Sequence, residues 1–328
     1  MLGCLRIKTL RGKPVKILIT GVAGFIGSNL ATRLKKEEHE IIGIDNFSSG
    51  ARTNIDDCIE FYEADIRTKE IYPYFKDVDY VFHLAAKNCL PDCLEDPVET
   101  AEINVVGTVN VLEAARRAGV KKIVYSDTSA EYEGILEFPS TEDEISPFSV
   151  YATSKNSGAA ICRNYERFFD QRITIVRYFN VYGPLQDWRR SMPPLMSAFV
   201  LKLLKGERPI IYGDGEKRRD FIYVDDVTDF NIMAAFDERT DGLVCNVGSG
   251  VNYSVKEILE IVKEMVGVDM PAIFKDELPG EAEVTLADIS RSKSFGWEPR
   301  VDLREGLRRF IAFVEEENII ESSRTGGR

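Results

Sequence analysis

Residues 15–27 read VKILITGVAGFIG, and this stretch decides the fold. Four of its first five residues are apolar and often β-branched, which is typical of a buried strand. Glycines follow at three positions, and residues 28–36 then show the apolar spacing of a helix. This order of strand, tight turn and helix can hold a pyrophosphate at a helix N-terminus. We expect Gly21 to allow the turn, Gly24 to let the backbone approach the phosphates, and Gly27 to let the helix pack on its strand.

The next apolar run indicates which dinucleotide would bind. Residues 40–44 end at Asp45, which stands 18 residues after Gly27. An acid at this place can accept hydrogen bonds from the ribose hydroxyls of adenosine. A carboxylate would repel the extra phosphate of NADP, and the neighbouring Asn46 brings no positive charge. The sequence therefore favours NAD, and the alternative is a glycine-rich turn in some other α/β protein.

Composition narrows the class of protein. The 328 residues are 44% hydrophobic and 29% charged, with a formal net charge of −12. An acidic chain argues against a nucleic-acid partner or an anionic membrane surface, and no apolar run approaches the ~20 residues of a membrane span. The six cysteines are scattered and lack the histidines that would complete a metal site. We expect reduced thiols, a cytoplasmic location and no metal.

Strands and helices alternate along the next hundred residues. Further strands are predicted at residues 59–63, 80–86 and 121–126, and a long helix over residues 99–118. This alternation predicts an α/β fold with a parallel, doubly wound sheet of the Rossmann type. Ligands of such sheets bind beyond the carboxyl ends of the strands.

The residues at these strand ends are therefore candidates for the cofactor site. Asp65 could reach the adenine amino group, or it could only cap the helix that follows. Small residues at the end of the fourth strand would let the cofactor lie against the backbone. The other positions expected at this edge of the sheet are Ile66, Leu84, Ala85, Ala86, Ser126, Thr128 and Ser129.

Tyr151 and Lys155 open a helix that is predicted over residues 151–169. Residues four apart share a helix face, so the two side chains project together. A free tyrosine has a pKa near 10, and a base near neutral pH needs this pKa lowered by about three units, or roughly 4 kcal/mol. A nearby ammonium and a cationic nicotinamide ring would lower it. Chance spacing on a surface helix is the alternative, but the pair follows a dinucleotide fold and a strand end rich in Ser and Thr.

Five motifs in chain order now carry a family resemblance. They are Thr20-Gly21-x-x-Gly24-Phe25-Ile26-Gly27, His83-Leu84-Ala85-Ala86, Tyr151-x-x-x-Lys155, Arg177-Tyr178-Phe179-Asn180-Val181-Tyr182-Gly183-Pro184 and Arg219-Asp220-Phe221-Ile222-Tyr223-Val224-Asp225-Asp226. Over residues 15–315 the chain resembles the extended short-chain dehydrogenase/reductase family, in particular its NAD-dependent nucleotide-sugar epimerases and dehydratases.

The resemblance implies roles for individual residues. Tyr151 would be the catalytic base, and Lys155 would tune it and hold the nicotinamide ribose. The hydroxyl that bonds the reacting sugar would come from Thr128 or from its neighbour Ser129. The remaining positions that the resemblance assigns are Phe25, Ile26 and Tyr178 at the cofactor, Asn180 and Arg219 at the substrate phosphates, and Thr285, a small residue that would leave room for an N-acetyl group.

The residues after Thr128 bear on the reaction. In the dehydratases and decarboxylases of this family an acid follows the catalytic threonine closely, whereas here Ser129-Ala130 comes first and Glu131 one place later. The resemblance therefore implies a UDP-hexose 4-epimerase that works through a transient 4-keto sugar, on UDP-glucose and UDP-galactose and also on their N-acetyl forms. The alternatives are a 4,6-dehydratase, a uronate epimerase or a 4-ketoreductase. A non-catalytic NAD sensor is a different class, and it would not need the trio Thr128, Tyr151 and Lys155.

The resemblance also divides the chain into two units. Residues 15–183 would form the NAD-binding domain, with residues 221–263 returning to it. Residues 184–220 and 264–318 would form a smaller, partly interleaved lobe for the sugar nucleotide. Residues 1–14 and 319–328 are expected to be flexible ends.

Two further expectations concern the surface and the phosphates. The helices over residues 99–118 and 151–169 would pair two copies into a homodimer, unless their apolar stripes only face the sheet. Leu278 replaces an arginine that contacts the diphosphate in relatives, and Arg189, Arg190 or Arg218 could compensate for it.

Overall fold

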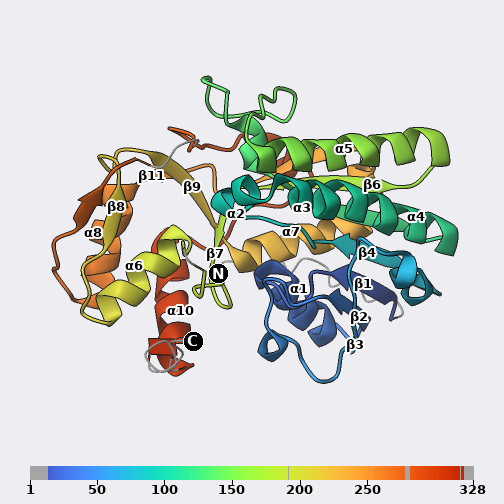
Figure 1. Ribbon diagram of the computed structural model, residues 1–328, viewed down its shortest axis with the longest axis horizontal. Helices are drawn as coiled ribbons and strands as arrows, with labels where there is room; N and C mark the ends of the chain where they lie inside the picture. Colours follow the sequence, from blue (N-terminus) through green and yellow to red (C-terminus); the bar gives the residue numbers. More distant parts are fainter. Residues whose placement is uncertain (1–13, 191, 278–280, 318, 321–328) are drawn as a thin grey trace, which may run out of the picture.

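The structure is a computed structural model that describes residues 14–190, 192–277, 281–317 and 319–320. It consists of a large unit built on the main sheet and a smaller lobe beside it (Figure 1). Most of the two expected flexible ends lies outside the described residues. Ile319 is an exception, because it is buried in the core of the lobe. Within the described part of the chain, no helix has both the length and the apolar character that crossing a membrane requires.

The main sheet has seven strands in the order β10-β6-β5-β4-β1-β2-β3, and every neighbouring pair is parallel. This confirms the predicted doubly wound α/β fold. The strands are β1 (Lys16–Thr20), β2 (Glu40–Asp45), β3 (Glu60–Glu63), β4 (Tyr80–His83), β5 (Lys122–Thr128), β6 (Ile173–Tyr178) and β10 (Val244–Val247).

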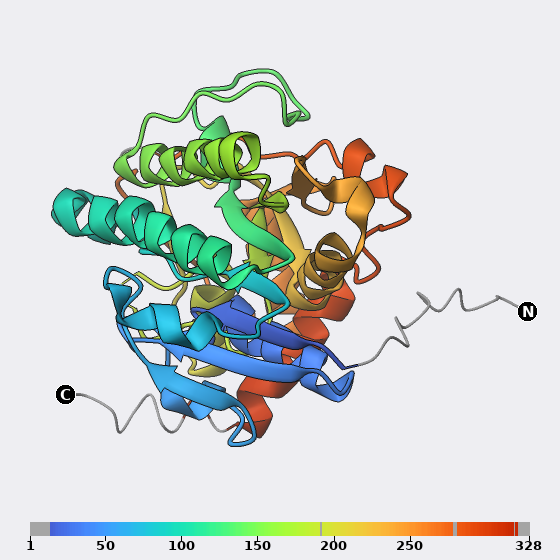
Figure 2. The same ribbon diagram turned by 90° about the vertical axis from the view of Figure 1, so that its right-hand side faces the viewer.

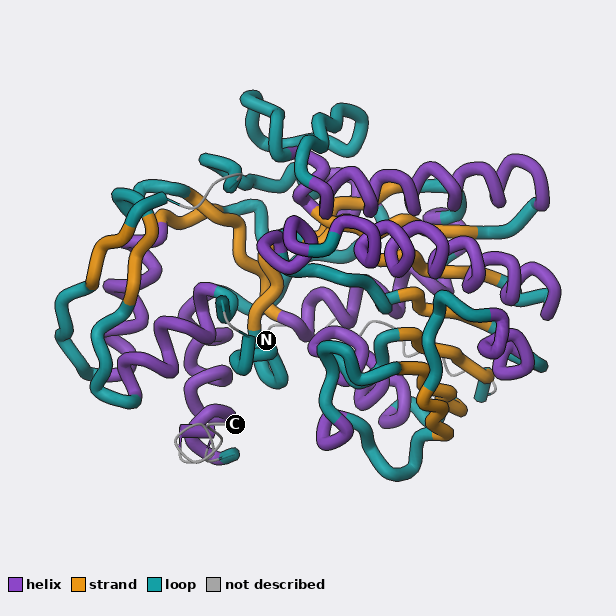
Figure 3. Tube along the Cα trace, in the orientation of Figure 1, coloured by secondary structure: helices purple, strands orange, loops and turns teal. Residues whose placement is uncertain are grey.

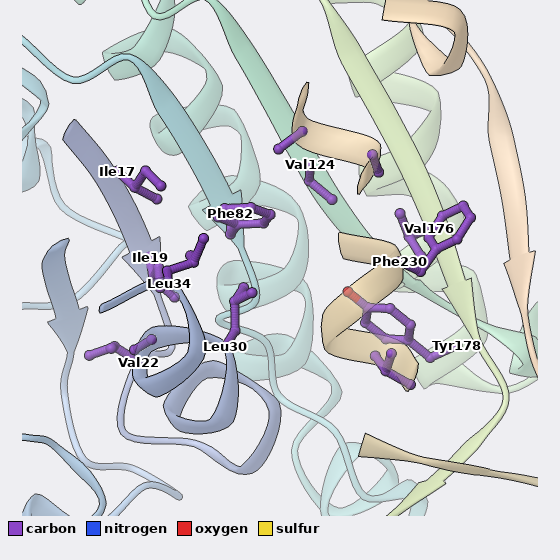
Figure 4. Close-up of a cluster of buried hydrophobic side chains, with 14 of the residues drawn as sticks. Ile17, Ile19, Val22, Leu30, Leu34, Phe82, Val124, Val176, Tyr178 and Phe230 are labelled. Carbon is purple, nitrogen blue, oxygen red and sulfur yellow. The ribbon is translucent and has the colours of Figure 1, made fainter. Parts of the chain in front are cut away.

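Successive side chains of each strand point to opposite faces of the sheet, so a hydrophobic core forms on each face. Ile17 and Ile19 face α1 (Phe25–Lys36) and α7 (Val224–Phe236), where they pack with Leu34 and Phe82 (Figure 4). Leu18 faces the opposite way, toward a second set of helices. That set consists of η2 (Lys69–Phe75), α4 (Thr108–Ala118) and α5 (Val150–Phe169), as the end-on view in Figure 2 shows.

The long helix predicted over residues 99–118 is present, but it contains a π-helical section. It consists of α3 (Pro97–Ala101), the π segment η3 (Glu102–Gly107) and α4, and it ends at Gly119, which has a φ of 71°. The sequence did not predict the π segment, which keeps the same apolar spacing. Its Asn104 side chain accepts a hydrogen bond from the Lys87 N–H (2.8 Å) and donates to Lys87 O and Ser154 Oγ (both 2.9 Å). The widened turn thus fixes the loop after β4 against α5.

The lobe has its own core, formed mainly by three helices and two small sheets. One sheet has the order β11-β9-β7, and in the other β12 pairs with β8. The elements of the lobe are β7 (Asn180–Tyr182), α6 (Leu195–Leu204), β8 (Ile210–Tyr212), β9 (Arg218–Tyr223), β11 (Asn252–Ser254), α8 (Val255–Val266), β12 (Ile273–Lys275) and α10 (Leu303–Glu316). The remaining short elements are η1 (Arg52–Asn54), α2 (Leu90–Glu95), η4 (Ser129–Tyr132), η5 (Glu238–Thr240) and α9 (Ser290–Ser294).

Two expected boundaries are wrong: β7, which was expected in the large unit, pairs with β9 in the lobe, and the second concerns α8. The sequence analysis assigned residues 221–263 to the large unit, but α8 buries Ile258, Leu259 and Val262 in the lobe core, with side chains from α6 and α10. The physical reason is the amphipathic stripe of α8, which is covered by these two helices and not by the main sheet. The chain therefore re-enters the lobe at β11, soon after β10 has completed the main sheet.

Candidate active site

One cleft of about 620 Å³ lies between the carboxyl ends of the main strands and the lobe. The loops that leave these strands, teal in Figure 3, face the lobe across it. The structure brings nearly all of the predicted site residues to this cleft. They are Gly21, Gly24, Phe25, Ile26, Gly27, Asp45, Asn46, Asp65, Ile66, Leu84, Ala85, Ala86, Ser126, Thr128, Tyr151, Lys155, Tyr178, Asn180 and Arg219.

The glycine turn leaves no space for side chains at two of its three positions. A Cβ on Gly27 would lie 2.2 Å from the carbonyl oxygen of Gly21, and a Cβ on Gly21 would lie 2.7 Å from the Ala85 nitrogen. Gly21 has a φ of +74°, which glycine adopts without strain. Gly24 is the N-cap of α1 and has no side chain to occupy the space in front of the helix. This bare N-terminus suits a pyrophosphate, so the residues present fit a dinucleotide.

The two acids at the adenosine end differ in their surroundings. Asp45 accepts hydrogen bonds from the backbone N–H groups of Ala23 (2.9 Å) and Phe47 (2.8 Å), and burial raises its pKa. Asp65 is held by the guanidinium of Arg67 at 2.7 Å, which lowers the pKa of Asp65. It also accepts a hydrogen bond from the Arg67 N–H (2.8 Å). The alternative role of Asp65 as a helix cap is therefore not what the structure shows, because η2 begins after Thr68.

Tyr151 and Thr128 both line the cleft. Tyr151 projects from the first turn of α5, and Thr128 is the last residue of β5. The Thr128 hydroxyl favours the ionised form of Tyr151, but burial is the larger effect and raises the pKa of Tyr151 to about 12. In the protein alone this tyrosine is therefore protonated at neutral pH. The expected lowering of its pKa is not produced by Lys155 alone.

Lys155 lies one helical turn further along α5 and is almost fully buried. Its Nζ stands 4.3 Å from the centroid of the Tyr125 ring, and the Tyr125 hydroxyl donates a hydrogen bond to the Lys155 carbonyl (3.1 Å). Burial lowers the pKa of Lys155 to about 8. Its charge is thus retained at neutral pH by a small margin.

Two predicted residues do not line the cleft. Ser129 begins η4 and does not line the cleft, so Thr128 is the one of the two hydroxyls that lines it with Tyr151. Thr285 lies behind Asn180, where its Oγ1 accepts hydrogen bonds from Asn180 Nδ2 (3.2 Å) and from the Asp220 N–H (3.0 Å). Pairing of the neighbouring Val284 with β9 places it there. Thr285 therefore orients Asn180 and does not itself line the cleft, and the expectation that its small size leaves room for an N-acetyl group stays a prediction.

The lobe side of the cleft carries the positive charge. Arg219 is mostly buried, which lowers its pKa, and its guanidinium lies 3.9 Å from Glu281. Lys217, which the sequence analysis missed, also lines the cleft and forms an ion pair with Glu277. Arg189 and Arg190 line the cleft and pair with Asp187 at 3.0 Å and 3.3 Å. Arg218 points away, toward Asn252 and Glu257. Leu278 lies outside the described residues.

Sequence reasoning missed three further features near the site. The first is Asn104, and its signal in the sequence is a polar amide within the helix predicted over residues 99–118. Lys217 stands two places before the motif that contains Arg219. The third is a buried ionic cluster below Thr128, formed by Asp127, Glu131 and Arg177, whose side chains have no exposed surface. The two acids are visible in the sequence, but their arginine lies on another strand.

The model of the NAD dependent epimerase/dehydratase family matches residues 17–248. A putative UDP-glucose 4-epimerase of Methanocaldococcus jannaschii is 37% identical over 306 residues, covering 92% of this chain and 99% of that protein.

The chain belongs to the NAD dependent epimerase/dehydratase family. Among solved structures, the UDP-glucose 4-epimerase of Thermotoga maritima with UDP-glucose has a TM-score of 0.89 and 34% identity, covering 93% of this chain and 100% of its own. That of Thermus thermophilus, in complex with NAD, has a TM-score of 0.86 and 30% identity, covering 92% and 99%. The chain is therefore an NAD-dependent enzyme, and the relatives named here are epimerases.

Proposed function

We propose that this enzyme inverts the configuration at C4 of a UDP-hexose through a transient 4-keto sugar. The observation that carries the proposal is that Thr128, Tyr151 and Lys155 line one cleft together with the glycine turn and residues of the lobe. The orientation of Glu131 supports an epimerase over a dehydratase. Its side chain is fully buried against Arg177 and does not line the cleft, so no acid follows Thr128 at the reacting sugar.

In this mechanism the residues of the chain handle one proton. Tyr151, as phenolate, accepts the proton of the C4 hydroxyl, and the Thr128 hydroxyl orients that group by hydrogen bonding. NAD, held by the residues named above, would supply a hydride acceptor and a positive charge. Because burial, as the largest effect, raises the pKa of Tyr151 to about 12, the tyrosine becomes an effective base only in the loaded enzyme. Tyr151 returns the proton once the ketone has presented its other face.

The two units would divide the binding between them. We propose that the glycine turn and Asp45 hold NAD on the large unit, and that Lys155 holds the nicotinamide ribose. Asn180 and Arg219 would hold the substrate diphosphate from the lobe. Anchoring at the diphosphate leaves the sugar ring free to turn, so that binding energy remote from C4 retains the reactive ketone.

The first test is proton NMR of the enzyme as purified, with UDP-glucose and, separately, UDP-N-acetylglucosamine, and without added cofactor. We expect the galacto epimer to appear. Tyr151→Phe should lower the rate by roughly 10²–10⁴-fold, because it removes the proton acceptor. Tyr165→Phe is the matched control, since this residue lies on the same helix but contacts Glu113 outside the cleft.

Three results would contradict the proposal. Tyr151→Phe could retain more than a few per cent of the activity. A 4-keto sugar could accumulate, or NADH could be consumed, which would indicate a dehydratase or a ketoreductase. Finally, turnover of a UDP-uronic acid in place of both hexoses would move the activity to a uronate epimerase.

We also propose a homodimer and a cytoplasmic location. The helices α4 and α5 lie side by side on one face of the large unit (Figures 1 and 2). Exposed apolar side chains accompany them, among them Val98, Val106 and Phe168. The five described cysteines are free thiols, which suits a reducing compartment.

A further inference from the structure

Lys217 is a buried cation on the lobe side of the cleft, and the mechanism above gives it no role. Its side chain is only 7% exposed, and it lines the cleft. Burial lowers the pKa of Lys217, but the carboxylates around it outweigh burial and raise this pKa overall, so the side chain is an ammonium at neutral pH. A buried ammonium needs negative partners. The nature of these partners decides what Lys217 does.

The backbone on either side of this lysine is fixed at the start of β9. The Val255 N–H donates to the Lys217 carbonyl (3.1 Å), and the Arg218 N–H donates to the Glu283 carbonyl (2.9 Å). Successive side chains of an extended segment point in opposite directions. Lys217 and Arg219 both line the cleft, whereas Arg218 between them points away from it. The segment therefore presents two cations, two residues apart, to the cleft.

A carboxylate oxygen marks the point between these two cations. Glu281 Oε2 lies 3.8 Å from Lys217 Nζ and 3.9 Å from Arg219 Nη2. The Lys217 ammonium also donates a hydrogen bond to the carbonyl oxygen of Glu281 (3.4 Å). One anionic oxygen shared by two cations shows that both charges are directed to the same place. That place belongs to the cleft wall, because Lys217, Arg219 and Glu281 all line the cleft.

The carboxylates that neutralise Lys217 are replaceable. Besides Glu281, the lysine forms ion pairs with Glu277 and, at 3.5 Å, with Glu283. The side chains of these three acids are 35%, 56% and 74% exposed, in that order. Ion pairs of exposed carboxylates contribute little, because water solvates the carboxylates well once they turn away. An anion that enters the cleft can therefore take the place of Glu281 between the two cations.

We propose that Lys217 is a substrate-binding residue that holds the diphosphate of the nucleotide sugar together with Arg219, at the position of Glu281 Oε2. A lysine acts on phosphate as a point charge, and a diphosphate has oxygens on two phosphorus atoms with which to bridge two cations. Asn180 adjoins this place, because its Nδ2 donates to the Asp220 carbonyl (3.1 Å) beside Arg219. The inference rests on the proposed function, since it assigns a further residue to the diphosphate of that substrate.

The test is a calorimetric titration of the enzyme as purified, with its cofactor, by UDP and separately by UMP. We expect Lys217→Gln to weaken UDP binding roughly 10- to 100-fold, because it removes one charged contact to phosphate. UMP binding should fall less, since a single phosphate still engages Arg219, so the preference for UDP over UMP should shrink. Lys217→Arg keeps the charge and should retain most of the affinity for UDP.

Two control variants separate binding from a structural role. Lys256→Gln removes another lysine of the lobe, which pairs with Glu216 (2.7 Å) outside the cleft, and it should leave UDP binding unchanged. Glu283→Gln breaks an ion pair of Lys217 outside the cleft but keeps the cation, so UDP binding should be unchanged or tighter. If Lys217 only tied the segment of Glu283 to β9, Glu283→Gln and Lys217→Gln would both weaken UDP and UMP alike.

An unchanged preference for UDP over UMP in Lys217→Gln would overturn the inference, and so would a parent protein that binds UDP no more tightly than UMP. If Lys217→Gln does not fold, Lys217→Met decides by the same comparison. In kinetics with UDP-glucose, KM should rise while kcat changes little, because the diphosphate contact is the same before and during the reaction.

The outcome for this inference is distinguishable from the outcome for the proposed function. A reduced preference for UDP in Lys217→Gln, in a protein that epimerises no UDP-hexose, would uphold the inference while the proposed function fails. A 4-epimerase in which Lys217→Gln leaves this preference unchanged would do the reverse.

Discussion

Gly27 preserves the shape of the cofactor site because it has no Cβ. A Cβ there would meet the Gly21 carbonyl at 2.2 Å, and that atom is backbone which cannot rotate away. The contact would push α1 off β1 and open the turn that faces the cleft. The same residue therefore serves packing and phosphate binding, and no alternative side chain can serve both.

Gly27→Ala is expected to cost several kcal/mol of stability and to abolish retention of NAD, since overpacking alone costs about 1–3 kcal/mol and here backbone must move. Urea unfolding and the cofactor content of the purified protein measure the two effects. Gly119→Ala is the control, because a Cβ there has nothing within 4 Å and meets only the strain of a positive φ, about 1–2 kcal/mol. Equal losses in both variants would contradict the steric argument.

Most site residues were predictable because their signals are local. The glycine turn, the pair Tyr151 and Lys155, and the acid Asp45 follow from spacing within one strand or one helix. Thr285 was misplaced because its position depends on how a loop pairs with β9, which no local pattern encodes. The contact between Asp127 and Arg177 was invisible for a similar reason, since it joins two strands 50 residues apart in the chain.

At the scale of elements, the π segment shows where a periodic pattern hides a local change. The apolar spacing over residues 99–118 fits a regular helix, and the prediction of a helix was right. The extra residue per turn in η3 is stabilised by the bonds of Asn104 to Lys87 and Ser154, partners from other elements. π segments often occur at functional sites, and this one borders the cleft through Ile103.

The same helices provide the test of the proposed dimer. Val98 and Val106 lie about two turns apart and are 68% and 49% exposed. Replacing both by aspartate should convert a dimer of 37.0 kDa chains into monomers in light scattering coupled to size exclusion, because buried charges without partners are costly. Phe274→Asp is the control, since this residue is 56% exposed on β12 of the lobe. A monomeric parent protein, or a dimer unaffected by both aspartates, would exclude this surface.

At the scale of the whole molecule, buried acids set the pH dependence of stability. Burial raises the pKa of Glu166 to about 7, and it also raises that of Glu131. The folded state then binds more protons than the unfolded state above pH ~4.3, so stability falls as the pH rises through this range. His83 has the opposite effect on stability, because burial lowers its pKa to about 3. Its contribution raises the free energy of unfolding between pH ~3 and ~6.5 and no longer changes above that, where the histidine is neutral in both states.

We therefore expect the free energy of unfolding to fall between pH ~6.5 and ~7.5, where the buried acids titrate and Lys155, with a pKa of about 8, still holds most of its proton. Urea denaturation at several pH values measures the slope. Glu166→Gln should make the slope shallower because it removes one raised pKa, and Glu95→Gln, an exposed acid on α2, should leave it unchanged. A stability that is flat or rising over this interval would show that these acids are ionised in the folded protein.

The path of the chain has a consequence for modularity. The strand β10 belongs to the main sheet but follows β9 of the lobe, and α8 of the lobe follows β10. No single cut can therefore separate the two units, because a fragment ending after β7 would lack an edge strand of the main sheet. Exchange of lobes between relatives, whether by recombination or by engineering, requires paired crossovers on both sides of β10. The residues that set cofactor specificity and those that set substrate specificity are therefore passed on together when the gene recombines.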